Sequence, residues 1–387
     1  FFFRNLNMAG RIVPYTRLES LSDAYEIGEL LAKGGFSEVF KGVHLKSGGV
    51  RAIKIMEKAI LTGKRGMMVA RETEILRRCS HPNLLTLYEV VETPTQMCLI
   101  MELVTGGDLY DYIVQRKSLT EEEAAKIIKA ILKAVEYLHN ATPPVVHRDI
   151  KPENVLIEDV QTERVMLSDF GLSKILNDPK LVECTPGGTS FYLPPEIIEG
   201  IKKHGARPRP TNVQDMKSLD LWSTGIVLYI LLCGSPPFKG SIRDQAERQR
   251  LLNQINQGVS FPENKWAGVS EQAKHLVSGL LQVEATKRLT VRQALTHPWI
   301  LQRDTVPVQL KTPNIFTNEY KNKKEFNEAV DGACKGVQEG QKDRKKEAQA
   351  AAAAGGGVGG PVGAMPGARS PAPTMNRPAF NPAQSSL

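Results

Sequence analysis

The fold is decided by His147-Arg148-Asp149-Ile150-Lys151-Pro152-Glu153-Asn154 and by Ser168-Asp169-Phe170-Gly171, which follows it closely. Mg²⁺ prefers oxygen ligands and usually takes only one or two of them from the protein, so Asn154 and Asp169 are the candidate metal ligands. Asp149 is then left to act as a base on a hydroxyl group. In phosphoryl transfer the protein mainly positions the reactants and neutralises charge, and these residues supply both. The spacing therefore predicts a phosphoryl-transfer site.

The pattern His-Arg-Asp-x-Lys-x-x-x-Asn followed by Asp-Phe-Gly resembles the eukaryotic protein kinases, over roughly residues 25–300. The resemblance implies an α+β fold of two lobes, with a small β-rich N-lobe at 25–103 and a larger, mainly α-helical C-lobe at 104–300. It also implies that Asp149 orients the substrate hydroxyl and accepts its proton, while Lys151 steadies the transferring phosphate. A lysine at this position resembles the serine/threonine kinases. The resemblance to protein kinases also implies that ATP and Mg²⁺ are the cofactors.

Upstream, residues 50–56 alternate like a half-buried strand and place Lys54 among apolar neighbours. An unpaired charge there would be costly, so Lys54 needs an anion. The resemblance supplies two anions, the ATP phosphates and a glutamate on a helix expected within residues 67–79. Glu72 is the predicted glutamate. Glu74 remains an alternative, because the register of a helix is not fixed by sequence alone.

The expected nucleotide loop departs from the family pattern Gly-x-Gly-x-x-Gly-x-Val. The corresponding stretch is Ala32-Lys33-Gly34-Gly35-Phe36-Ser37-Glu38-Val39, so Ala32 and Ser37 replace the first and third glycines. Glycine matters here because backbone N–H groups must approach the phosphates closely in a tight turn. Alanine and serine add only small side chains, and Gly35 adds freedom. We therefore expect altered nucleotide affinity more than lost catalysis.

The resemblance also implies how ATP would be held. Apolar side chains would sandwich the adenine, Met101 would be the gatekeeper, and the backbones of Glu102 and Val104 would hydrogen-bond the adenine edge. The residues expected around the nucleotide are Leu31, Ala32, Lys33, Gly34, Gly35, Phe36, Ser37, Val39, Ala52, Lys54, Met101, Glu102, Val104, Asp108, Glu153, Asn154, Leu156 and Asp169.

Two acidic residues indicate the substrate class. In related kinases the positions of Asp108 and Glu153 bind an arginine three residues before the acceptor, which implies protein substrates with basic residues before the acceptor. Ile230 stands where a glutamate often selects arginine two residues before the acceptor, so that second preference should be absent. For Asp108, hydrogen bonding to the ribose alone remains an alternative.

The segment between Asp169 and Pro194-Pro195-Glu196 has the length of an activation loop. Thr185 is the predicted regulatory phosphosite. Arg148 lies beside the expected catalytic aspartate and is a cation, and a phosphate on the loop would supply it with a counter-charge. Pro186 follows Thr185, which favours a proline-directed upstream activating kinase. An unmodified, solvated loop is the alternative.

Further motifs narrow the resemblance. It implies that Glu196 pairs with Arg288 and that Asp220 holds the backbone of the catalytic loop. The stretches that are most similar to the calcium/calmodulin-dependent kinase group are Gly106-Gly107-Asp108-Leu109-Tyr110-Asp111, Asp220-Leu221-Trp222-Ser223-Thr224-Gly225 and Ser235-Pro236-Pro237-Phe238.

Composition and charge argue against several other classes of protein. The 387 residues carry a net charge of +8, but no basic helix interleaved with aromatic residues is evident, so nucleic acid is not an expected partner. Five cysteines show no Cys-x-x-Cys spacing, which argues against zinc and against a disulfide framework. This favours the cytoplasm or nucleus over secretion. No apolar run is evident at membrane-spanning length, so we expect no membrane span.

The segments before and after the kinase-like region are assigned separately. Residues 1–24 are an N-terminal extension, residues 301–347 a partly helical segment of the regulatory type, and residues 348–387 an Ala/Gly/Pro-rich tail that cannot bury enough apolar surface to fold. Calmodulin is one candidate partner of residues 316–347, although acidic residues interrupt the basic face that such a helix needs. The basic insertion at 202–209 is either a docking loop or a solvated loop.

The sequence thus favours a serine/threonine protein kinase that transfers the γ-phosphate of ATP to proteins. Ala32 and Ser37 leave a second hypothesis, a catalytically weak kinase fold that acts as a scaffold. A third hypothesis is an adaptor whose function lies in the tail. In that case deleting residues 301–387 would abolish partner binding and spare ATP turnover.

Overall fold

The computed structural model describes residues 13–116, 119–176, 192–202, 212–240, 242, 244–301, 309–310 and 325, with the backbone only at positions 64, 201, 202 and 309. Several predictions concern residues outside this set. They are the phosphosite Thr185, the side chains of the basic insertion, most of the segment 301–347 and the whole of the tail 348–387.

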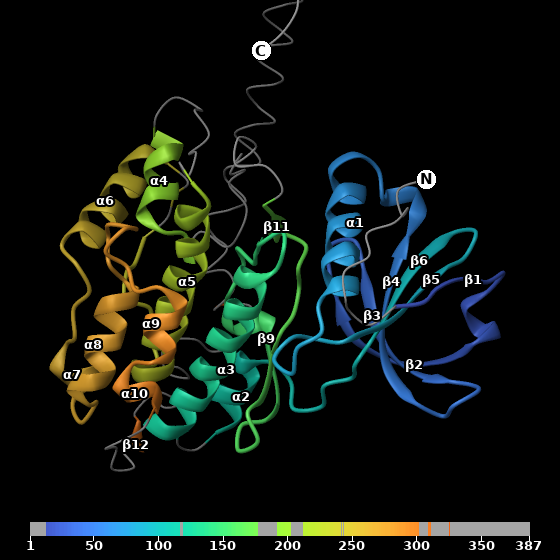
Figure 1. Cartoon of the computed structure of the whole chain (residues 1–387), viewed down its shortest axis with the longest axis horizontal. Helices are drawn as coiled ribbons and strands as arrows, with labels where there is room; N and C mark the ends of the chain where they lie inside the picture. Colours follow the sequence, from blue (N-terminus) through green and yellow to red (C-terminus); the bar gives the residue numbers. More distant parts are fainter. Residues whose placement is uncertain are drawn as a thin grey trace, which may run out of the picture. The chain divides into compact units, whose positions relative to one another are not determined.

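A six-stranded sheet forms the N-lobe, in the order β1-β5-β6-β4-β3-β2 (Figure 1). Its paired strands are antiparallel, except that β1 and β5 run parallel. Helix α1 (Gly63–Arg78) connects β4 to β5. The strands are β1 (Tyr15–Arg17), β2 (Tyr25–Lys33), β3 (Glu38–His44), β4 (Val50–Glu57), β5 (Leu87–Glu92) and β6 (Gln96–Met101).

Strand β4 has the alternation that its sequence predicts. Ala52 and Met56 belong to the large hydrophobic core, whereas Ile53 belongs to a second, smaller cluster on the other face of the sheet. Successive side chains of a strand point to opposite faces, so Lys54 lies on the same face as Ala52 and Met56. The period of the strand thus directs Lys54 toward the large core and the helix packed there.

Helices dominate the C-lobe (Figure 1), where α3 and α5 are the longest at 20 and 21 residues. The helices are α2 (Leu109–Gln115), α3 (Glu121–Asn140), α4 (Pro195–Lys202), α5 (Val213–Cys233), α6 (Gln245–Asn256), α7 (Glu263–Trp266), α8 (Glu271–Leu280), α9 (Val291–Leu295) and α10 (Pro298–Leu301). The short strands are β7 (Leu119–Thr120), β8 (Val145–Val146), β9 (Val155–Asp159), β10 (Arg164–Leu167), β11 (Lys174–Ile175) and β12 (Gln309–Leu310), and the 3-10 turn η3 (Pro152–Asn154) precedes β9.

Helix α3 begins at a capping box. The side chain of Thr120 accepts a hydrogen bond from Glu123 N, and the Glu123 carboxylate accepts one from Thr120 N. Acidic residues fill the first turn, where they complement the helix dipole. One of them, Glu121, is buried and accepts hydrogen bonds from Trp299 Nε1 and Ser270 N, each at 2.7 Å. The start of α3 is therefore tied to α8 and α10.

Helix α5 is apolar over its second half and is buried from Ser218 to Cys233. By length and composition alone it could cross a membrane, because an 18-residue window of it has a mean hydropathy of 1.4. The expectation that the chain has no apolar run of membrane-spanning length is wrong for this helix. In the structure 94% of that apolar window is buried inside the protein, and α5 packs against α3 and α8. A helix that is hydrophobic on every face is typical of a protein core. The core of the C-lobe accounts for its composition.

The predicted α+β class with a β-rich N-lobe and a helical C-lobe is confirmed. One hydrophobic core contains residues of both lobes, among them Leu99 and Leu132. The link before β5 is also bonded to the C-lobe, because Asn83 Nδ2 donates to the carbonyl of Val165 at 2.9 Å.

The predicted N-terminal extension, residues 1–24, contributes two elements. They are β1 and the 3-10 turn η1 (Leu21–Asp23). Strand β1 is the edge strand of the sheet, next to β5.

Two histidines stack between α8 and α10. Nδ1 of His275 lies 2.8 Å from Nε2 of His297, whose Nδ1 accepts a hydrogen bond from Trp299 N at 3.2 Å. His297 therefore carries its single proton on Nε2, and a second proton on Nδ1 would break the bond to Trp299. Burial, and then the neighbouring His275, lower the pKa of His297.

We predict that protonation of His297 destabilises the fold as the pH falls below about 6.5. The pKa of His297 is lower in the folded protein than its ordinary value, so the unfolded chain binds this proton more readily. His297→Asn keeps a carbonyl oxygen for Trp299 N without titrating, and should flatten the fall in unfolding free energy between about pH 7 and about pH 5.5. Urea unfolding across this pH range measures the unfolding free energy, with His44→Asn as the control. An unchanged slope in His297→Asn would contradict the prediction.

Candidate active site

Strand β4 and helix α1 bring Lys54 and Glu72 together. Lys54 Nζ lies 2.6 Å from Glu72 Oε1, and the two side chains are 13% and 4% exposed. The alternative carboxylate, Glu74, pairs instead with Arg78 one turn later on the same helix. The rotation of α1 about its axis therefore directs Glu72, and not Glu74, toward β4.

The charge of Lys54 is set by two carboxylates. Burial by itself would lower the pKa of Lys54, but the charges of Glu72 and Asp169 outweigh it and raise that pKa. The ammonium group therefore stays protonated at neutral pH. Asp169 comes from the C-lobe, so this interaction joins the strand of the N-lobe to the Asp-Phe-Gly motif.

Asp220 of α5 holds the backbone of the catalytic loop. Its Oδ2 accepts a hydrogen bond from His147 N at 2.9 Å, and its Oδ1 accepts one from Arg148 N at 2.8 Å. Burial raises the pKa of Asp220, but the hydrogen bond and charge of His139 more than offset this and lower it. Arg148 has a φ of +69°, a conformation that costs free energy and needs such support. The predicted anchoring by Asp220 is confirmed.

The carboxylate of Asp149 is contacted by two residues of the same loop. Asn154 Nδ2 donates to Asp149 Oδ2 at 2.9 Å and to the Asp149 carbonyl at 2.8 Å. Lys151 Nζ lies 3.2 Å from the same Oδ2. Because Nδ2 of Asn154 is used in this way, its Oδ1 is the amide atom that is offered to a cation.

The Asp-Phe-Gly motif is fixed by packing behind it. Phe170 is fully buried, and its ring centroid lies 5.0 Å from that of His147. Asp169 has a φ of +58°, and its Oδ1 accepts a hydrogen bond from Gly171 N at 3.2 Å. His147 Nε2 lies 3.1 Å from the carbonyl of Ser168. The same histidine thus supports the catalytic loop and the segment that carries Asp169.

The turn between β2 and β3 contains the unusual glycine pattern. Gly34 N donates to the carbonyl of Ser37 at 2.8 Å. A Cβ at Gly34 would lie 3.1 Å from Ser37 Oγ and 3.3 Å from the Ser37 carbonyl oxygen, whereas a Cβ at Gly35 would meet nothing within 4 Å. Lys33 pairs with Glu38 at 2.7 Å across the turn. A side chain at Gly34 would therefore crowd Ser37 and need it to shift slightly, whereas a side chain at Gly35 would meet open space.

The residues predicted to surround adenine come from both lobes. Ala52 lies directly opposite Met101 in the register of β4 and β6. Glu102 N donates to the carbonyl of Thr86 at 2.9 Å, so at this position the carbonyl, and not the N–H, is offered to a ligand. The remaining predicted contacts lie on β2 (Leu31 and Ala32), in the turn (Phe36), on β3 (Val39), after β6 (Val104) and on β9 (Leu156).

Three carboxylates lie near one another: Asp108 at the start of α2, Asp149 in the catalytic loop and Glu153 in η3. Asp108 caps α2 by accepting a hydrogen bond from Asp111 N at 3.0 Å. Glu153 Oε2 is buried and accepts no hydrogen bond from the described residues. The pKa of Glu153 is raised to about 7, mainly by burial and also by the charges of Asp149 and Asp108, which together outweigh the lowering by Lys151. A cationic ligand would stabilise the ionised form of the Glu153 carboxyl group.

Two supporting residues were missed by the sequence analysis. His139 Nε2 lies 2.9 Å from Asp220 Oδ2, and Ser173 Oγ donates to the carbonyl of His147 at 3.1 Å. Neither belongs to a motif, and a histidine in the last turn of a helix is equally common in solvent. The three cysteines that the structure describes, Cys79, Cys98 and Cys233, are free.

Comparison with known proteins identifies the family. The family model for the protein kinase domain matches residues 25–300, so the chain belongs to the protein kinase family. A probable myosin light chain kinase of Dictyostelium discoideum is 39% identical over 282 residues, which are 72% of this chain and 84% of that protein. Calcium/calmodulin-dependent protein kinase type 1B of Homo sapiens is 40% identical over 283 residues, 73% of this chain and 76% of that protein. The chain is therefore an ATP-dependent serine/threonine protein kinase with relatives in the calcium/calmodulin-dependent group, as its motifs predict.

We predict that Glu153→Gln stabilises the protein at about pH 8 by on the order of 2 kcal/mol and has little effect near pH 4.5. The pKa of Glu153 is raised on folding, so its contribution to stability is present below the ordinary carboxyl pKa and is lost as the pH rises through about 7. Glutamine does not titrate. Urea unfolding at both pH values checks this, with the exposed Glu199→Gln as the control. An equal effect at both pH values would rule out a buried carboxylate as the cause.

Proposed function

We propose that this kinase transfers the γ-phosphate of ATP to serine and threonine residues of proteins, with Asp149 as the base and with Mg²⁺ held by Asn154 and Asp169. The observation that carries the proposal is the cluster around Asp149 Oδ2, which both Asn154 Nδ2 and Lys151 Nζ contact. A base, a metal-binding amide and a cation then meet within one loop.

The chemistry of these residues fits Mg²⁺ and ATP. Asn154 Oδ1 and the Asp169 carboxylate are hard oxygen donors of the kind that Mg²⁺ prefers. Lys54 is a cation held in place by Glu72, and the turn at Gly34 is tight enough that a side chain there would crowd Ser37. When bound, ATP supplies the phosphoryl group and Mg²⁺ offsets the charge on the phosphates.

Asp149 would act directly on the protein substrate. Its carboxylate orients the acceptor hydroxyl and takes up its proton. Lys151 Nζ, 3.2 Å from Asp149 Oδ2, is close enough to stabilise negative charge beside the acceptor oxygen. Asp220 holds the backbone that carries both residues, so little reorganisation is needed during the reaction.

Substrate preference is proposed from the carboxylates that lie beside this base. An arginine three residues before the acceptor would bring several N–H donors to Asp108 and Glu153. The buried Oε2 of Glu153, which accepts no hydrogen bond from the described part of the chain, supports this role because a basic ligand would supply one.

Regulation is proposed at two places. An upstream kinase would phosphorylate Thr185, and calmodulin would act on residues 316–347, as the name of the type 1B relative suggests. Strand β12 pairs with β7, which ties the post-kinase segment to the C-lobe before α3. Glu325 in that segment is close enough for its charge to contribute to the pKa of Tyr110 in α2, which burial in the first place raises to about 12. These contacts support a regulatory role for the segment.

A catalytically weak scaffold is the second candidate, and Ala32 and Ser37 in the nucleotide loop favour it. The two candidates differ in whether a base is needed. Loss of the base would remove the activity of an enzyme and would leave the partner binding of a scaffold unchanged.

We predict that Asp149→Asn lowers kcat by about 100-fold or more while ATP still binds, because removal of a general base typically costs this much. The assay follows Mg²⁺-dependent phosphate transfer from ATP to an Arg-x-x-Ser peptide, using protein whose Thr185 is shown by mass spectrometry to be phosphorylated. Asp159→Asn, at the end of β9, is the matched control. If the wild type and Asp149→Asn bound ATP and were equally inactive, the scaffold would replace the enzyme as the proposed function.

We predict that the preference for arginine increases between about pH 6 and about pH 8, because kcat/KM follows the ionisation of the free enzyme and Glu153 ionises near pH 7. The measurement is the ratio of kcat/KM for an Arg-x-x-Ser peptide to that for an Ala-x-x-Ser peptide. The ratio should rise several-fold in the wild type and stay level in Glu153→Gln. A pH-independent preference in the wild type would assign the recognition to Asp108 alone.

A further inference from the structure

The first described residues of the chain contact the helix that carries Glu72. We propose that residues 13–17, here called the N-terminal clamp, position α1 and thereby hold Glu72 against Lys54. The clamp itself touches neither of these two residues in the described contacts. The inference rests on the proposed role of the Lys54–Glu72 pair in the kinase reaction.

The backbone of the clamp is fixed to β5 at both ends. Val90 N donates to the carbonyl of Pro14 at 3.0 Å, and Leu18 N, just after β1, donates to the carbonyl of Glu92 at 3.0 Å. A short strand at the edge of a sheet has only one neighbouring strand, so these hydrogen bonds determine where it lies.

Side chains strengthen the same junction. Tyr15 Oη donates to Glu92 Oε2, Arg17 Nε lies 3.2 Å from the same oxygen, and Lys58 Nζ lies 2.6 Å from Glu92 Oε1. Hydrogen bonds from Lys58 and Tyr15 lower the pKa of Glu92 to about 2. Glu92 is therefore ionised over the working pH range, and this junction does not depend on pH near neutrality.

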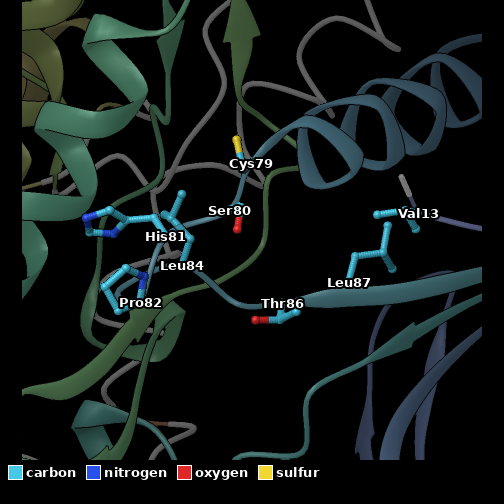
Figure 2. A pocket seen from close by; sticks show the side chains of 8 residues that line it. All are labelled: Val13, Cys79, Ser80, His81, Pro82, Leu84, Thr86 and Leu87. Carbon is cyan, nitrogen blue, oxygen red and sulfur yellow. The ribbon is translucent and has the colours of Figure 1, made fainter. Parts of the chain in front are cut away.

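The other side of the clamp meets the end of α1. Arg77 Nη2, in the last turn of that helix, donates to the carbonyl of Val13 at 3.3 Å. Val13 is 4% exposed and belongs to the same hydrophobic core as Ile75 of α1. It also lines a cavity of about 250 Å³ together with Cys79, where α1 ends, and Leu87, where β5 begins. Figure 2 shows Val13 and Leu87 on the same side of this cavity.

These contacts place the clamp between strand β5 and helix α1. The position of α1 determines whether Glu72 reaches Lys54. Glu72 lies upstream of Arg77 in α1, and a helix of this length moves largely as a rigid body. The Lys54–Glu72 hydrogen bond is 2.6 Å long, and a shift of about 1 Å would break its geometry. Losing the contact between Arg77 and Val13 would therefore misplace Glu72 without removing any group that touches nucleotide or substrate.

The test compares two truncated forms of the full chain, one that begins at residue 13 and one that begins at residue 18. The first keeps the clamp and should retain wild-type kinetics. The second should lose about tenfold in kcat/KM for ATP, while KM for the peptide stays the same, because the effect acts through Lys54. Equal kinetics of the two truncated forms would overturn the inference.

A point variant covers the case in which the shorter chain does not fold. Arg77→Met removes the hydrogen bond to Val13 and keeps an unbranched side chain of similar length. It should also weaken kcat/KM for ATP, whereas Arg65→Met, in the exposed first turn of the same helix, should not. Thermal unfolding of each variant checks that the fold is retained. Wild-type kinetics in a folded Arg77→Met would count against the clamp.

A double-mutant cycle separates positioning from general stability. If the clamp acts through Glu72, Arg77→Met should change kcat/KM by less than about twofold when Glu72→Gln is already present. Fully additive losses would show that the clamp acts elsewhere and would overturn the inference. If Glu72→Gln alone left activity unchanged, the proposed role of the ion pair would fail, and the inference with it. The two failures are therefore distinguishable.

Discussion

The ammonium group of Lys54 is the constraint on which the N-lobe depends. It lies on a strand between apolar residues, where an unpaired charge would cost several kcal/mol. A carboxylate must therefore reach it, and Glu72 does so at 2.6 Å. This requirement fixes the rotation of α1 about its axis and directs Ile75 and its neighbours into the core. The packing of the helix and the charge balance of the site thus have the same origin.

The C-lobe is organised around a second buried carboxylate. Asp220 lies in the buried part of α5, and its burial is tolerated because His139 and two backbone N–H groups satisfy it. Those N–H groups belong to His147 and Arg148, immediately before Asp149. The strained φ of Arg148 is held in this way, and the orientation of the proposed base follows from the core of the lobe.

The unusual nucleotide loop follows an irregular stretch of the sheet, because the pairing of β2 with β3 shifts register between Leu30 and Ala32. Ala32 lies opposite Val39 in the pairing of β2 with β3, a strand position that accepts a methyl group readily. Gly34 is retained where the turn is closed by Ser37, and Gly35 faces open space. The two replacements thus stand beside a strand pair that still joins Ala32 to Val39 and a turn that is still closed by Gly34 N and the Ser37 carbonyl. This agrees with a family member that keeps Lys54 and Asp169 in mutual electrostatic contact.

The sequence by itself determined the family, the two lobes and the residues of the catalytic loop, because these depend on groups that are close together in the chain. Asp149, Lys151 and Asn154 share one loop, so their spacing already implies that they meet. The sequence predicted Glu72 and kept Glu74 as an alternative; the tertiary structure confirmed Glu72, because the two residues point about 160° apart around a helix and only Glu72 reaches Lys54. It also decided the pairing of β1 with β5 and the burial of the Glu153 carboxylate. Each of these depends on packing between distant segments, which local sequence patterns do not encode.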